Sequence, residues 1–131
     1  MDQTHILYTV FNKIEEKKGE NPIILDLRGI TIITDYFLIA NGQNIVHVKA
    51  IADAVLKQLE EENIRPQRIE GYQEGRWILL DYGFMIIHIL TKEERDFYHL
   101  EQLWHGAKIL TPSYLRCRET PMNKGTLKYQ K

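Results

Sequence analysis

The sequence RWILLDYGFMIIHIL, residues 76–90, places two apolar runs on either side of a Tyr-Gly pair. Two apolar runs with so short a connection predict a β-hairpin, in which Gly83 supplies the backbone freedom of a tight turn. A Trp, an Asp and a His nevertheless lie inside these runs. The hairpin is therefore a core element, a catalytic site or a surface that binds a partner, and the chemistry of its two faces has to decide between these roles.

The two predicted faces of this hairpin differ in chemistry. If the Tyr-Gly pair is the loop, Asp81 pairs with Phe84 and Trp77 pairs with His88, and side chains alternate between the two sides of the sheet. One face is entirely aliphatic or thioether and suits a protein core. It comprises Ile78, Leu80, Met85, Ile87 and Ile89. The other, which we call the mixed face, is apolar in bulk but carries a carboxylate, an imidazole and an indole. It comprises Trp77, Leu79, Asp81, Phe84, Ile86 and His88.

The composition of the mixed face leaves two interpretations open. Aromatic, aliphatic and polar groups together are typical of a surface patch that binds another protein. Alternatively, a C-terminal helix covers this face, and the Trp77 N–H and His88 form hydrogen bonds inside the domain. A catalytic pair is not expected, because Asp81 and His88 would lie four residues apart along the strands, about 14 Å, which is beyond hydrogen-bond reach.

The sequence contains no spacing typical of a metal site or a phosphate-binding loop. The five His residues show no HxH or HExxH spacing, and a lone Cys117 excludes a CxxC site. Neither GxGxxG nor GxxxxGK[ST] occurs. The NGQN segment at 41–44 is only a weak anion-site candidate compared with a plain turn and helix cap. We therefore expect no catalytic residue, no metal and no cofactor.

Hydrophobic spacing and turn residues predict the remaining elements. Helical periodicity predicts a first helix capped by Thr4 and ended by Gly19, and a second helix capped by Asn44. Thr91 and Glu94 form a capping box for a last helix. That helix carries an apolar stripe of Phe97, Leu100, Trp104 and Ala107. Further strands are expected at 22–27, 35–42 and 67–71, while 28–34 is ambiguous between strand and loop.

The resulting order, αββαβββα, indicates a single α/β domain with a mixed, roughly five-stranded sheet flanked by helices. We assign residues 1–106 to this domain and residues 107–131 to a basic, partly irregular C-terminal tail. Residues 1–106 hold 11 Lys/Arg and 17 Asp/Glu, a net charge of −6, whereas residues 107–131 hold 6 Lys/Arg and 1 Asp/Glu, a net charge of +5. An acidic body fits a basic protein partner, and a basic tail fits contact with nucleic acid.

Targeting signals are not evident in the chain. The start MDQTHILYTV has no basic region before a long apolar stretch, so we expect no secretory signal. No apolar run approaches the ~18 residues of a membrane span. A lone cysteine fits a reducing compartment. These features predict a cytoplasmic protein without membrane contact.

Several segments in a fixed order resemble one known family. They are ITDYFLIANGQNIVHVKAIADAV, RIEG, WILLDYG, a His five residues beyond that Gly, and RDFYHLEQLW. The combination is similar to the ribosomal silencing factor family, also called the Iojap family, from about residue 4 to residue 106. That family is similar in fold to nucleotidyltransferases, which implies a nucleotidyltransferase-like topology. The alternative function is therefore a nucleotidyltransferase-like nucleotide-binding domain or enzyme, although the paired carboxylates that nucleotidyl transfer needs are missing near Asp81.

The resemblance implies a translational repressor rather than an enzyme. Such factors bind the large ribosomal subunit through its interface protein number fourteen and sterically block joining of the small subunit. Phe84 stands where the family commonly has Asp, so the binding surface is expected to be more apolar here. Family members are associated with self-dimers, and the tail, which exceeds the family's typical end, is a candidate for ribosomal RNA contact. Carried over residue by residue, the surface comprises Trp77, Asp81, Tyr82, His88, Arg95, Tyr98 and Glu101, with Glu70 as a weaker candidate. Phe84 is added to this surface because its predicted register places it on the mixed face.

Overall fold

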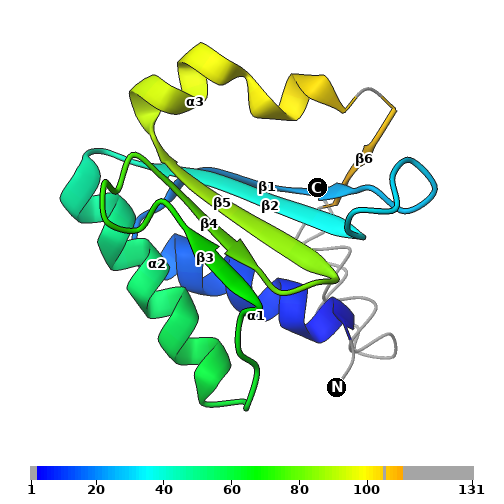
Figure 1. The fold of residues 1–131 in the computed structure, drawn as a ribbon, viewed down its shortest axis with the longest axis horizontal. Helices are drawn as coiled ribbons and strands as arrows, with labels where there is room; N and C mark the ends of the chain where they lie inside the picture. Colours follow the sequence, from blue (N-terminus) through cyan, green and yellow to red (C-terminus); the bar gives the residue numbers. More distant parts are fainter. Residues whose placement is uncertain (1–2, 105, 111–131) are drawn as a thin grey trace, which may run out of the picture.

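The domain is built on one mixed sheet (Figure 1). The computed structural model describes residues 3–104 and 106–110. The strands are β1 (Glu20–Asp26), β2 (Tyr36–Gly42), β3 (Arg68–Glu70), β4 (Trp77–Asp81), β5 (Met85–Thr91) and β6 (Lys108–Leu110). They lie in the order β3-β4-β5-β2-β1-β6; β2 and β5 are parallel and the other neighbours are antiparallel. The predicted α/β class and mixed sheet are confirmed, with six strands instead of five.

Strand β6 is the element that the sequence did not predict. Irregular backbone was expected after Gly106, but residues 108–110 pair antiparallel with β1, where Leu110 lies opposite Ile24. Three residues are too few for a periodic pattern, so this strand is defined by its pairing with the edge of β1 and not by its own sequence. The rest of the predicted tail, residues 111–131, lies outside the described residues.

Two long helices, α1 (Gln3–Glu16) and α2 (Ile45–Glu60), cover one side of the sheet (Figure 1). Each buries one apolar stripe at helical spacing against the sheet. The side of the sheet that faces these two helices includes the predicted aliphatic face of the hairpin. Its five members are fully buried: Ile78, Leu80, Met85, Ile87 and Ile89. Among the helices that the structure describes, none is long and apolar enough to cross a membrane.

The predicted helix boundaries are partly right. The Asn44 side chain caps α2 by accepting a hydrogen bond from the His47 backbone N–H at 2.9 Å, as expected. The prediction for Thr4 is wrong, because Thr4 lies buried inside α1. After α1 ends, Lys18 adopts a left-handed backbone with φ 66°, and the Gly19 N–H donates to the carbonyl of Ile14 at 2.8 Å. A side chain at Gly19 would collide with Ile14, so glycine is needed here.

The hairpin turn is displaced by one residue from the predicted position. Asp81 lies opposite Ile86 and Trp77 opposite Leu90, so the loop is Gly83–Phe84 and the predicted pairing was wrong. Gly83 has φ +87°, and glycine at the first loop position is typical of the type II′ turns that fit twisted hairpins. Moving the loop by one residue changes the pairing of the two strands by two residues. Each side chain in these strands therefore stays on the face of the sheet that was predicted for it. Phe84, however, packs against the aliphatic side and does not belong to the mixed face.

The predicted last helix is two short pieces. Helix α3 (Lys92–Tyr98) ends where His99 takes a left-handed backbone, and the 3₁₀ helix η1 (Leu100–Leu103) follows. The apolar stripe therefore does not continue across the break: Leu100 is buried, but Phe97 is 75% exposed. The Thr91 side chain accepts from the Glu94 N–H at 3.3 Å, as a capping box requires. The Thr91 N–H itself pairs with the Arg76 carbonyl, so only half of the box forms.

Candidate partner-binding surface

Helix α3 and η1 cover only part of the mixed face. Helix α3 packs on β5 and β2, on the side of the sheet opposite to α1 and α2 (Figure 1). Beneath it lies a second apolar cluster that comprises Leu25, Leu27, Phe37, Ile39, Ile86, Leu90 and Leu100. On the neighbouring strands, Arg68 lies opposite Asp81 and Glu70 lies opposite Leu79, so these four side chains share the mixed face. All four are exposed or partly exposed, and we call them the open half.

Trp77 lies at the border between the covered part and the open half. Its indole is partly exposed, and its N–H donates to His88 Nδ1 at 3.1 Å. The Tyr98 ring packs on it with 5.2 Å between ring centroids. The predicted cover by a C-terminal helix is therefore partly met, and partner binding by the exposed part of the mixed face stays a prediction. The Trp77 N–H and His88 are bonded inside the domain, while Trp77 as a whole remains partly exposed and the open half is accessible.

His88 is an internal residue that fixes Trp77. It is 4% exposed, and the Phe37 ring lies against it at 4.5 Å between centroids. Burial lowers the pKa of His88 to about 4, because a low-dielectric site disfavours the charged imidazolium. Since Nδ1 accepts the indole N–H, the neutral ring carries its proton on Nε2. That buried Nε2 atom has no hydrogen-bond partner among the described residues.

The geometry of Asp81 and His88 does not form a catalytic pair. In the observed register they are two residues apart along the hairpin, about 7 Å and not the predicted 14 Å. Asp81 accepts instead from the Gly83 backbone N–H at 2.8 Å and from Arg68 at 3.4 Å. Within residues 3–104 and 106–110, no group of three or more His, Cys, Asp or Glu side chains is placed to hold a metal ion.

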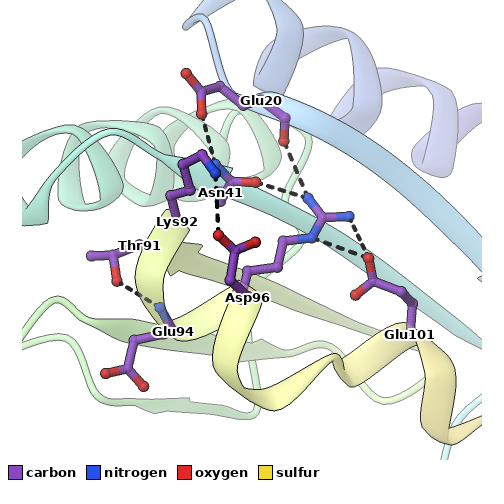
Figure 2. Close-up of polar contacts among 8 residues, drawn as sticks. Glu20, Asn41, Thr91, Lys92, Glu94, Asp96 and Glu101 are labelled. Carbon is purple, nitrogen blue, oxygen red and sulfur yellow. Dashed lines mark hydrogen bonds and ion pairs between the residues drawn. The ribbon is translucent and has the colours of Figure 1, made fainter.

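A buried arginine, Arg95, links α3 to the sheet through contacts that include Asn41 and Glu101, both labelled in Figure 2. Arg95 is 8% exposed, and its guanidinium donates to the Asn21 carbonyl at 2.7 Å, to Asn41 Oδ1 at 3.1 Å and to Glu101 at 3.0 Å. Asn41 in turn donates to the Glu20 carboxylate at 2.8 Å. The guanidinium therefore links α3 and η1 to β1 and β2. Arg95 and Glu101 were both predicted as partner-binding residues. Here their contacts hold α3 and η1, which cover part of the mixed face, in position.

The remaining predicted residues divide between surface and interior. Glu70 and Tyr98 are exposed. Tyr82 is buried in the aliphatic core, and this burial raises the pKa of its hydroxyl to about 12. Phe84 is partly buried beside the same core. Among the nine predicted residues, the exposed and partly exposed members of the mixed face, α3 and η1 are Glu70, Trp77, Asp81, Tyr98 and Glu101.

Two residues of this surface were missed by sequence reasoning. Phe37 supports His88 from β2, and its position could have been read from alternation in the predicted strand 35–42. Arg68 contacts Asp81 and Glu70 from β3, at 3.4 Å and 3.3 Å. Its place on the mixed face depends on which strand pairs with the hairpin, and the sequence carries no signal for that choice.

The sequence model of the family described as "Ribosomal silencing factor during starvation" matches residues 2–128. The chain is 38% identical over 107 residues to the "Ribosomal silencing factor RsfS" of Halalkalibacterium halodurans, which covers 82% of this chain and 92% of that one. It is also 35% identical over 74 residues to the "Mitochondrial assembly of ribosomal large subunit protein 1" of Mus musculus, covering 54% of this chain and 32% of that one. The family match confirms the predicted resemblance and extends past residue 106 into the tail.

A solved structure has the same fold. The crystal structure of a protein from Chromobacterium violaceum superposes with a TM-score of 0.78 at 31% identity, covering 82% of this chain and 90% of that chain. Sequence and structural similarity therefore extend over the same large share of the chain. The architecture that carries the mixed face is one that this relative shares.

Proposed function

The chain belongs to the ribosomal silencing factor family, and on this basis we propose that it binds the large ribosomal subunit and keeps the small subunit from joining it. The proposed docking point is the interface protein number fourteen of the large subunit. A factor bound to a surface that the two subunits share excludes the small subunit by its volume alone. This mechanism requires affinity and correct placement but no chemical step.

The observation that carries this proposal is the partly exposed Trp77 beside the open half. Its indole is oriented by the His88 hydrogen bond and by the Tyr98 ring, so little conformational freedom remains to be lost on binding. Aromatic side chains with a polar surround are typical centres of binding energy in interfaces. Leu79, next to Trp77 on the same face, adds apolar area to the contact.

Charge favours a basic protein as the partner. Residues 1–106 carry a net charge of −6, from 11 Lys/Arg and 17 Asp/Glu. On the open half, the Asp81 and Glu70 carboxylates flank the single guanidinium of Arg68. Complementary charge accelerates association and is weakened by salt. The same surface would be hidden in a self-dimer, so dimerisation would compete with ribosome binding.

The buried members of the predicted surface have a supporting role in this proposal. His88 orients Trp77, and Arg95 holds α3, which carries Tyr98 to the border of the open half. Tyr82 lies in the aliphatic core directly after β4. These three buried residues support the contact surface from inside the domain and need not touch the partner.

Two linked measurements test the proposed function. The protein is first sedimented with purified large subunits and, as the control, with purified small subunits. Association of the two subunits is then followed by light scattering with and without the protein. We expect binding to large subunits only, and fewer joined ribosomes when the protein is added first. Binding without any effect on joining contradicts the steric block, and absence of binding contradicts the whole proposal.

The basic tail is proposed to add contact with ribosomal RNA. Residues 107–131 carry a net charge of +5, and lysine and arginine gain affinity for phosphates by releasing counterions. Removal of residues 120–131 should weaken large-subunit binding at low salt and change it little at high salt. Equal binding of the truncated and full-length proteins at both salt concentrations contradicts this role.

A further inference from the structure

The loop between β1 and β2 exposes three isoleucines within four positions. Ile32 is fully exposed, Ile33 is 68% exposed and Ile30 is 42% exposed. An isolated apolar side chain on a surface is ordinary, but adjacent large aliphatic side chains form a patch that commonly marks an interaction site. The fold itself does not bury them, so their contribution to stability is small and a different role is required to explain them.

This loop has a fixed backbone. The Ile30 and Thr31 N–H groups both donate to the Leu27 carbonyl, at 3.0 and 3.2 Å. The Ile33 N–H donates to the Thr31 hydroxyl at 3.2 Å, and the Thr34 hydroxyl donates to the Gly83 carbonyl at 2.9 Å. The isoleucines are therefore presented on an ordered loop that loses little backbone entropy when a partner binds.

The chemistry of the loop favours protein and not RNA as its partner. Residues 29–34 contain no charged side chain. At the base of the loop, the Arg28 guanidinium is paired with the Asp26 carboxylate at 2.7 Å and stacks over the Tyr36 ring at 5.3 Å. Phosphate contacts are made mainly by unpaired cations and polar groups. An uncharged aliphatic tip instead gains affinity by burying apolar area against apolar side chains.

The loop is continuous with the surface assigned above to the ribosomal partner. Thr34 bonds to Gly83, and the N–H groups of Asp35 and Tyr36 donate to the Phe84 carbonyl at 3.1 Å. Asp81, at the end of the open half, accepts from the Gly83 N–H at 2.8 Å. The hairpin turn is thus bonded to the loop on one side and to the open half on the other, and the three segments form one connected end of the molecule.

We infer that the β1–β2 loop is a second anchor for the large ribosomal subunit. In this arrangement Ile32 and Ile33 enter an apolar depression on a ribosomal protein that neighbours the protein contacted by Trp77. This inference rests on the proposed function. It adds a contact that no charged or aromatic residue of the mixed face supplies. Salt should have little effect on this contribution, in contrast to that of the acidic open half.

The test compares a double variant with a matched control. Ile32→Thr/Ile33→Thr keeps the β-branched shape of both side chains and removes apolar area, while Val46→Thr makes the same type of change at a position that is 77% exposed on α2. Affinity for purified large subunits is measured by sedimentation, oligomeric mass by light scattering, and folding by thermal unfolding. We expect the double variant to bind about tenfold more weakly at every salt concentration, with unchanged mass and melting temperature. Val46→Thr should bind as the unmodified protein does.

The possible failures are distinguishable. If the unmodified protein binds large subunits and the double variant binds equally well, the second anchor is overturned while the proposed function stands. If the double variant changes the oligomeric mass with unchanged ribosome affinity, the loop is a contact between copies of this chain and the inference is overturned. If the unmodified protein does not bind large subunits, the proposed function and this inference fall together.

Discussion

The two sides of the sheet use the same strands for different purposes. On one side, Ile78, Ile87 and Ile89 are fully buried beneath the two long helices α1 and α2. On the other side, a seven-residue helix and one 3₁₀ turn cover only part of the strands. The first side contains aliphatic groups that have no need of specific partners, whereas the second combines rings, carboxylates and an imidazole that do.

This difference separates stability from recognition. Burial of aliphatic area stabilises the fold in proportion to that area and without regard to direction. Trp77, His88 and Arg95 are instead held by directed hydrogen bonds at 3.1 Å or less. Such contacts fix the orientation of a surface more than they add to its stability. A change on the aliphatic side should therefore affect unfolding, and a change at the border of the mixed face should affect binding.

The largest expected effect comes from the aliphatic side. Ile87→Ala removes three carbons from a fully buried side chain between β5 and the helices, which should lower the free energy of unfolding by about 2–5 kcal/mol. Leu79→Ala, on the open half of the mixed face, should cost less than about 1 kcal/mol. Urea unfolding of the two variants measures this difference. Similar losses in both variants would remove the distinction between the two sides.

The next effect concerns the hydrogen bonds of Arg95 that attach α3 to the sheet. Arg95→Leu leaves Asn41, Glu101 and the Asn21 carbonyl without their donor, and it should destabilise the domain by about 2–3 kcal/mol. Hydrogen exchange should rise mainly in α3 and η1. Lys92→Leu is the control, because the Lys92–Asp96 pair on the same helix is about two-thirds exposed and such surface pairs contribute little. Equal hydrogen exchange in the two variants would refute the role of Arg95.

A smaller effect is expected from the titration of His88. Its pKa is lowered to about 4 in the folded protein, from about 6.5 when unfolded. As pH falls from 6.5 towards 4, the unfolded chain gains a proton that the folded chain does not, so stability falls with pH. Between pH 7 and pH 5 this difference amounts to about 2 kcal/mol. His88→Asn should lose that part of the pH dependence while keeping an acceptor for the Trp77 N–H. An unchanged pH dependence in the variant would show that His88 is not the titrating group.

The fold could be predicted where local patterns decide structure. Alternation in residues 77–81 and 85–89 assigned the two faces correctly, and the stripe of α2 from Val48 to Leu59 marked a buried helix. Both patterns survive small errors in register, because a displacement by two residues returns each side chain to the same side. The family resemblance was also available from sequence, since it rests on motifs and not on contacts.

The details that sequence could not supply depend on distant contacts. The hairpin register was set by Gly83 occupying the first loop position, whereas the Tyr-Gly pair suggested a loop one residue earlier. The break at His99 places a histidine in a left-handed backbone that no composition rule predicts. Arg95 reads as a solvated helix residue until its partners on β1 and β2, more than fifty positions away, are known.

The central claim is that Trp77 and the open half bind the large ribosomal subunit, and the affinity of Trp77→Ala for purified large subunits tests it most directly. Because the indole is partly exposed, the variant should remain folded by circular dichroism yet bind about thirtyfold more weakly, equivalent to a loss of about 2 kcal/mol. Tyr72→Ala is the matched aromatic control, since Tyr72 bonds to Asp53 of α2 on the opposite side of the sheet, and it should bind normally. A folded Trp77→Ala protein with unchanged affinity, or a variant that fails to fold because the indole belongs to the core, would contradict the claim.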